Sequence, residues 1–430
     1  MKQTYSENTA LLGFCETDIT PDYPVRTIGF GREDEMSRGV LAPLKAQAAL
    51  WQLGKERCVL VTIDHIGFGT EHATKLRGDI GRLIGTGEDK VMLCFSHTHS
   101  APNDSIEDAW REFADRRIKD AVRKAATGLS PVLAAWGNGR TGIGVNRRIE
   151  RDEMDSRIGI IRAADENDRN RLLILRLTAH ANVLKADNFL ISPDYFGEVR
   201  SLLQEKYGCP VMVTQGASGN AAPKYFSSAI NPPDADDPDR YIRTDRALLC
   251  MAQEVLHSVD EVIGTLECRP VTRLGMYCVK ESFDASVPDM ERAEAVAAEA
   301  KEYAGIDGTH WLREVKRLHS EGIVKQQETV TLQYFVLNDG CFCGVPNEIM
   351  CEFALKACRR LGSSHFYLGG YTNGCTGYWP GEEEYDKGGY EVFWSMLIYY
   401  VYYGRVFPLD RDSAQVLIRT AAEHAPGELS

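Results

Sequence analysis

The chain has 430 residues, of which 43% are hydrophobic and 26% charged, values typical of a soluble protein with one large domain or two ordinary ones. Its formal net charge of −13 disfavours nucleic acids and anionic membranes as main partners, because both favour clusters of Lys and Arg. No apolar run approaches the roughly 20 residues that span a bilayer, so no membrane insertion is expected.

Strands and helices are predicted to alternate along the chain, which indicates an α/β fold with a mixed or mostly parallel sheet and flanking helices. Apolar stretches bounded by turn residues predict strands at 44–53, 58–63, 91–95, 133–136, 158–161, 172–177, 211–214, 330–337, 341–345 and 366–368. Helical spacing predicts helices at 70–83, 106–129, 196–207, 246–258, 290–303, 311–319, 348–360, 392–402 and 413–423.

The strand at 91–95 leads into the most informative stretch, Ser96-His97-Thr98-His99-Ser100-Ala101-Pro102. Alternate side chains of a strand point to the same face, so His97 and His99 point the same way if the extended backbone continues. Zinc takes neutral imidazole nitrogens in a tetrahedral array, and two imidazoles at a strand end can begin such a site. A His-x-His pair alone more often marks two histidines that are merely hydrogen-bonded.

Further polar groups lie at other predicted strand ends. His180 follows one strand, and the loop at 215–223 follows another. Open α/β sheets place ligand sites outside the carboxyl ends of their strands, so these groups are expected to converge with His97 and His99. Glu348 is the candidate carboxylate; it is interpreted as opening a helix, where its alternative role is a favourable partner of the helix dipole.

Short motifs are spread over the whole chain in a fixed order: Asp18-Ile19-Thr20-Pro21, Arg38-Gly39-Val40, residues 96–102, Asn146-Arg147, Pro346-Asn347-Glu348, residues 370–378, Glu383-Glu384-Tyr385 and Tyr390. In these motifs the chain resembles the neutral (non-lysosomal) ceramidase family. The resemblance implies a single ceramidase-type catalytic domain over residues 1–430, with the predicted helices at about 287–320 as an insertion. The immunoglobulin-like carboxyl-terminal domain of ceramidases is not expected here.

The resemblance also implies roles for individual residues. Four positions match the family's zinc ligands: His97, His180, Glu348 and Tyr378. Three match residues that line the scissile amide and assist proton transfer or oxyanion binding: His99, Arg147 and Tyr390. Such a zinc site lowers the pKa of its water toward about 7 and polarises a carbonyl. Without the resemblance, the two tyrosines are more typical of structural aromatic residues, and Arg147 of an ion-paired surface side chain.

One position departs from the family pattern. Ceramidases carry a catalytic Ser in Gly-Asp-Val-Ser-Pro, whereas this chain, aligned on the proline, reads Gly219-Asn220-Ala221-Ala222-Pro223. Ala222 can neither attack a carbonyl nor bind metal, so ceramide hydrolysis is not expected and a zinc-bound water is the expected nucleophile. Ser218 and Asn220 are candidate substrate-binding residues, and a shifted alignment would make Ser218 the replacement for the missing serine.

The amino-terminal residues and the cysteines favour a reducing cellular compartment. Residues 1–12 lack the apolar core of an export signal, and the 12 cysteines form no dense disulfide framework, so reduced thiols in a cytoplasm are expected. Cys341 and Cys343 lie in an apolar run and are interpreted as buried core thiols.

The sequence therefore predicts a cytoplasmic zinc hydrolase that cleaves an amide, or alternatively a lactone or other ester, of a small polar substrate. The same ligand set is compatible with iron or manganese. A zinc-dependent lyase or isomerase acting on a carbonyl compound and a non-catalytic binding protein remain open as alternatives. The expected partner is a small molecule, and a homo-oligomer is compatible with the sequence.

Overall fold

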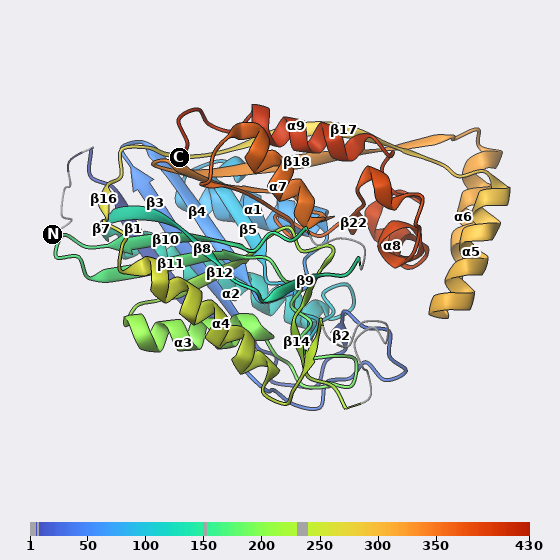
Figure 1. The fold of residues 1–430 in the computed structure, drawn as a ribbon, viewed down its shortest axis with the longest axis horizontal. Helices are drawn as coiled ribbons and strands as arrows, with labels where there is room; N and C mark the ends of the chain where they lie inside the picture. The colour runs from blue at the N-terminus through green and yellow to red at the C-terminus, as the bar shows by residue number, and fades with distance from the viewer. Residues whose placement is uncertain (1–5, 7, 149–152, 230–239) are drawn as a thin grey trace.

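Three larger β-sheets lie at the centre of the computed structural model, which describes residue 6 and residues 8–148, 153–229 and 240–430 (Figure 1). The first sheet has the order β5-β4-β3-β1-β7. Its strands are β1 (Leu11–Asp18), β3 (Lys45–Leu53), β4 (Glu56–Ile63), β5 (Val91–Phe95) and β7 (Ser130–Pro131). Helices α1 (Thr70–Ile84) and α2 (Asp108–Thr127) pack against it.

The other two sheets follow the same plan. The second, β12-β11-β10-β8-β16, consists of β8 (Leu133–Arg140), β10 (Arg157–Ala164), β11 (Asn170–Leu177), β12 (Val211–Gln215) and β16 (Arg269–Pro270), with α3 (Tyr195–Tyr207) and α4 (Ala247–Ile263) against it. The third, β17-β18-β19-β21, consists of β17 (Leu274–Ser286), β18 (Lys325–Leu337), β19 (Gly340–Gly344) and β21 (Phe366–Gly369), with α7 (Cys351–Leu361) and α9 (Ser413–Glu423).

Shorter elements connect these layers. They are β2 (Thr27–Ile28), β6 (Ala101–Pro102), β9 (Gly144–Asn146), β13 (Ala221–Pro223), β14 (Tyr225–Phe226), β15 (Ile242–Arg243), β20 (Glu348–Ile349), β22 (Tyr378–Trp379), a π-helical turn (Tyr390–Trp394) and α8 (Ser395–Tyr403). Helices α5 (Met290–Ala304) and α6 (Thr309–Ser320), which match the helices predicted at 290–303 and 311–319, connect β17 to β18 and project at one end of the molecule (Figure 1).

A central core joins the three sheets and explains the continuous apolar runs in the sequence. It contains Trp51 from the first sheet, Trp136 from the second and Phe335 from the third, all buried. Along β5, Met92 and Cys94 face this core while alternate residues face α1 and α2, so both faces of the strand are covered. The predicted burial of Cys341 and Cys343 is confirmed.

Each main sheet contains one parallel pair at one edge: β4 with β5, β11 with β12, and β19 with β21. The remaining pairings in these sheets are antiparallel. The α/β class and the mixed sheet are therefore confirmed, but the pairing is mostly antiparallel rather than mostly parallel. The reason is that short turns join β3 to β4, β10 to β11 and β18 to β19, and short turns can connect only antiparallel strands.

The three edge strands β5, β12 and β21 meet at their carboxyl ends. The backbone N–H of Phe95 donates to the Tyr371 carbonyl at 3.0 Å, and that of Gly370 donates to the Gly216 carbonyl at 3.1 Å. The side-chain oxygen of Asn373 accepts from the Leu93 N–H at 2.9 Å. Loops that leave the three sheets are thereby collected at one place in the molecule.

Two details of the predicted elements need correction. Glu348 does not open a helix: it lies in β20, which pairs in parallel with β22, and α7 begins only at Cys351. The predicted helix over 392–402 begins with a π-helical turn at Tyr390–Trp394 before α8. None of the helices in the described part of the chain combines the length and apolarity that a bilayer crossing requires.

A buried ion pair fixes α3 to the end of β4. The guanidinium of Arg200 donates to both carboxylate oxygens of Asp64, at 2.8 and 2.5 Å, and both residues are at most 4% exposed. Arg200→Met leaves the Asp64 charge buried without its partner, so we expect the free energy of unfolding to fall by about 3–5 kcal/mol in urea denaturation. The double variant Arg200→Met/Asp64→Leu is expected to recover most of that loss; an equally unstable double variant would contradict this explanation.

Asp194 precedes α3 and is expected to make the stability of the fold depend on pH. Its carboxylate accepts from the backbone N–H groups of Val183, Leu184 and Tyr195, yet burial raises its pKa to about 6. A carboxyl pKa that is raised on folding stabilises the fold below about pH 4, and this contribution is lost as the pH rises through about 6.

In the wild type, ionisation of Asp194 is expected to lower the free energy of unfolding by up to about 3 kcal/mol as the pH rises from about 4 to about 7. In Asp194→Asn, which has no titrating group at this position, this loss of stability is expected to be absent. Urea denaturation of both proteins across this range measures the difference, which cancels the contributions of the other titrating groups. Parallel pH profiles of variant and wild type would contradict the prediction.

Candidate metal centre

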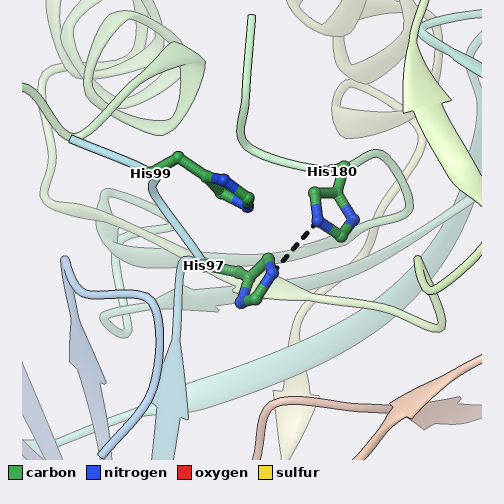
Figure 2. A group of neighbouring side chains, drawn as sticks. All are labelled: His97, His99 and His180. Carbon is green, nitrogen blue, oxygen red and sulfur yellow. Dashed lines mark hydrogen bonds between the residues drawn. The ribbon is translucent and has the colours of Figure 1, made fainter. Parts of the chain in front are cut away.

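Three buried histidines gather beyond the carboxyl ends of β5 and β11 (Figure 2). His97 and His99 follow β5, and His180 follows β11; their exposed fractions are 2%, 9% and 1%. One ring nitrogen from each lies within 4.8 Å of those of the other two, and the Nε2 atoms of His97 and His180 are 3.1 Å apart. The predicted convergence of these strand ends is present in the structure.

The backbone reaches this arrangement differently from the simple alternation of a strand. His97 adopts a left-handed conformation with φ of 63°, so the extended backbone does not continue beyond β5. The loop after β4 holds it there: the His97 N–H donates to the carbonyl of His65 at 2.9 Å. The turn at His97 brings the two imidazoles to the same space from the end of a single strand.

The hydrogen bonds of the three rings define their tautomers. Each Nδ1 lies against a backbone carbonyl: His97 on Ile66 at 2.6 Å, His99 on Gly29 at 2.9 Å and His180 on Ser218 at 3.1 Å. A carbonyl only accepts hydrogen bonds, so each Nδ1 carries a proton, and in the neutral form of each ring Nε2 has an unshared electron pair. Backbone carbonyls that hold Nδ1–H in this way are typical of histidines whose other nitrogen binds a metal.

The three ring nitrogens that do not contact a backbone carbonyl are available to a cation. The Nε2 atoms of His97 and His180 lie 3.1 Å apart, and the buried Nε2 of His99 has no hydrogen-bond partner among the described residues. Burial lowers the pKa of His99 and of His180 well below the usual value, and neighbouring His97 and Arg147 add to the effect. Neutral imidazole is the form that binds metal, so this donor set fits a metal ion.

Glu348 adds a carboxylate to the same space. Its Oε2 lies 3.2 Å from His97 Nε2 and 3.8 Å from His180 Nε2, and the residue is 6% exposed. Glu348 reaches this position from β20, on the segment that follows β19. Two imidazoles and a carboxylate are ligands common to zinc, iron and manganese sites.

Tyr371, which was not among the predicted site residues, contacts the Glu348 carboxylate. Its hydroxyl lies 3.3 Å from Glu348 Oε2 and accepts a hydrogen bond from Ser218 Oγ at 3.1 Å. Its ring lies 4.3 Å from that of His97, centroid to centroid. The only signal in the sequence was its place in the motif at 370–378, because its orientation depends on a left-handed backbone with φ of 52°.

The other predicted residues form a second group beside Glu348. Tyr378 pairs with Glu348 across β20 and β22, and its ring lies 6.0 Å from that of Tyr390. Arg147 hydrogen-bonds Tyr378 and lies 3.3 Å from Glu391 Oε1. Burial acts to lower the pKa of Arg147, but these two partners outweigh it and the pKa is raised, so the guanidinium stays charged.

Ser218 and Asn220 lie in the loop that leaves β12, and their side chains are held by the protein. Ser218 is fully buried against Tyr371. The amide nitrogen of Asn220 donates to Glu352 at 2.9 Å, and its oxygen accepts from the N–H of Cys351, the first residue of α7, at 2.9 Å. In this structure Asn220 connects the loop to α7.

The fold of this chain is similar to that of two solved ceramidase structures. The chain is similar to the solved structure of a neutral ceramidase from Pseudomonas aeruginosa, with a TM-score of 0.70 and 17% identity, covering 98% of this chain and 76% of that one. It is also similar to a solved ceramidase complexed with C2, with a TM-score of 0.67 and 16% identity, covering 96% and 74%. The chain has a ceramidase-like fold. No family model and no curated protein matches the sequence.

The resemblance read from the motifs is thus confirmed for the fold. Within this ceramidase-like fold, His97, His99, His180 and Glu348 converge on one buried space. In the same fold Tyr378 pairs with Glu348, and the ring of Tyr390 lies beside that of Tyr378. The catalytic roles of Arg147 and Tyr390 remain predictions.

Proposed function

We propose that this protein is a zinc-dependent hydrolase that cleaves the amide bond of a small polar substrate, with a lactone or other ester as the second choice. The observation that carries the proposal is the convergence of three imidazole rings and one carboxylate in a buried space. The ceramidase-like fold supports the choice of hydrolysis among the reactions that such a site can perform.

In this proposal His97, His180 and Glu348 hold the metal, and Tyr378 is the fourth protein ligand. A divalent metal at this position supplies a Lewis acid that polarises a carbonyl and acidifies water. The loop after β4 and the carbonyl of Ser218 keep the Nε2 atoms of His97 and His180 directed at it. Tyr371 orients the Glu348 carboxylate through the contact between its hydroxyl and Oε2.

His99 moves the proton. Its Nδ1–H is held by the Gly29 carbonyl, which leaves Nε2 free to accept a proton from the attacking water and pass it to the leaving nitrogen. Arg147 stays charged beside Tyr378 and donates to the oxyanion that develops on the substrate carbonyl, with Tyr390 as a second donor. Ala222, at the position of the family's serine, takes no part, which is why a substrate other than ceramide is proposed.

We also infer that the protein works in a reducing compartment such as the cytoplasm. Its 12 cysteines are all free in the structure, and structural thiols persist as such where glutathione keeps them reduced.

The proposal is tested by metal analysis joined to a turnover screen in ¹⁸O-labelled water. We expect about one zinc per chain and, for a substrate among amides, lactones and esters, incorporation of the label into the product. Turnover without incorporation of the label would favour a lyase or isomerase. Protein that takes up no divalent metal would overturn the proposal.

A further inference from the structure

A small pocket adjoins the proposed metal centre on the side of α8. It has a volume of about 120 Å³ and is lined by His97, by Cys375 and by Tyr399, Tyr402 and Tyr403 of α8. Cys375 Sγ lies 4.0 Å from Glu348 Oε1, so the pocket and the centre share a wall. An engineered cavity of about 150 Å³ holds a benzene molecule, and this pocket therefore suits a group of similar or slightly smaller size.

The pocket contains a buried carboxylate that lacks a compensating charge. Asp104 lines it, is 7% exposed, and accepts no side-chain hydrogen bond from the described residues. The one basic group within 4.0 Å among them is His65, whose Nε2 is 3.7 Å from Asp104 Oδ1. A carboxylate in such a largely buried position is stabilised by a positively charged or donating group, and the pocket has room for one beside Asp104.

His65 does not supply that charge, because both of its ring nitrogens are in use. Nε2 lies 2.8 Å from the carbonyl of Pro102 and therefore carries a proton, while Nδ1 accepts the N–H of Gly67 at 3.1 Å. A ring that donates at one nitrogen and accepts at the other is the neutral form. The Asp104 carboxylate therefore faces the pocket with its charge uncompensated.

Three tyrosines of α8 line the same pocket as this carboxylate. The ring of Tyr399 lies 5.9 Å from that of Tyr403 and 6.5 Å from that of Tyr402. Aromatic faces attract ammonium groups, most strongly where water is excluded. The guanidinium of Arg405 lies 5.9 Å from the ring centroid of Tyr403 and donates a hydrogen bond to Glu328 at 2.6 Å, which leaves Tyr399 and Tyr402 as the tyrosines without a cation from the described part of the protein.

We propose that this pocket binds an ammonium group of the substrate, with Asp104 as its counter-charge and the tyrosines of α8 as its aromatic wall. The inference deepens the proposed function and rests on it: the substrate is an amide that also carries a cationic amine. Since His97 lines both the pocket and the metal centre, the ammonium lies a few bonds from the scissile carbonyl.

The test compares choline with its neutral carbon isostere, 3,3-dimethylbutan-1-ol, as ligands of the full-length protein in isothermal titration calorimetry. We expect choline to bind at least about tenfold more tightly than the isostere, because only the cation pairs with Asp104. In Asp104→Asn this preference is expected to disappear while the affinity for the isostere stays the same. The matched control is Asp108→Asn, whose side chain is 71% exposed and outside the pocket; it is expected to keep the preference.

A second variant keeps the test decisive if Asp104→Asn fails to fold. Tyr402 is 60% exposed, so Tyr402→Leu is expected to fold normally and to bind choline about threefold more weakly. Equal affinity for the two probes, no binding of either, or an unchanged preference in Asp104→Asn would overturn the inference. Because binding is measured without turnover, an inactive protein that prefers choline refutes the hydrolase alone, and an active hydrolase without the preference refutes the pocket alone.

Discussion

His97→Ala and Glu348→Gln are expected to lower the metal content of the purified protein from about one ion per chain to a trace. Each variant removes one of the groups whose atoms lie within 3.2 Å of each other at the centre of the site. Loss of an outer partner of a metal ligand already weakens metal binding about 10–100-fold, so loss of a ligand is expected to cost more than about 100-fold. Elemental analysis and competition with a chelator measure the effect.

The control for this experiment is His257→Ala. His257 lies on α4 with its side chain 79% exposed, and its replacement is expected to leave the metal content unchanged. Metal retained at one ion per chain by both His97→Ala and Glu348→Gln would contradict the proposed centre. Since Glu348→Gln preserves the shape of the side chain, its loss of metal cannot be attributed to a cavity in the core.

His99→Gln is expected to keep the metal and to lower kcat by about 10²–10⁴-fold, the usual contribution of a general acid and base. The reason is that His99 Nε2 faces the centre without a hydrogen-bond partner among the described residues, while Glu348 and the other two imidazoles supply the ligands. Turnover of a substrate found in the screen, together with metal analysis of the same sample, measures both effects. Loss of metal in His99→Gln would instead assign this residue to the ligand set.

Sequence reasoning reached the imidazoles because their position depends on a general property of sheets. His97 and His180 each follow a strand of a parallel pair, and the carboxyl ends of such strands form one edge. Glu348 was found as a residue but assigned to the wrong element, because its two-residue strand pairs with β22, from which α7 and β21 separate it in the sequence. Pairing of distant short strands leaves no periodic pattern in the sequence.

The parts that sequence reasoning missed depend on how separate elements dock. One predicted sheet is three sheets in the structure, and their common core around Trp51, Trp136 and Phe335 joins apolar runs that look alike in the sequence. Tyr371 and His97 both adopt a left-handed backbone conformation, which cannot be predicted from the pattern of neighbouring side chains. Asp104 was not singled out either, because the lack of a partner for a carboxylate is visible only when its neighbours are placed.

The meeting of β5, β12 and β21 at their carboxyl ends has a consequence for how the protein folds. The hydrogen bond from Leu93 to Asn373 closes a loop of 280 residues, and contacts of such sequence separation form slowly. Each sheet can form from strands that are near one another in the sequence. His97, His180 and Glu348, the three groups in contact at the candidate metal centre, come together only after all three sheets have docked. During refolding, competence to capture a metal ion is therefore expected to appear no earlier than the slowest docking step, and later than helix formation. A cobalt(II) absorbance signal recorded beside far-UV circular dichroism would separate the two events in time.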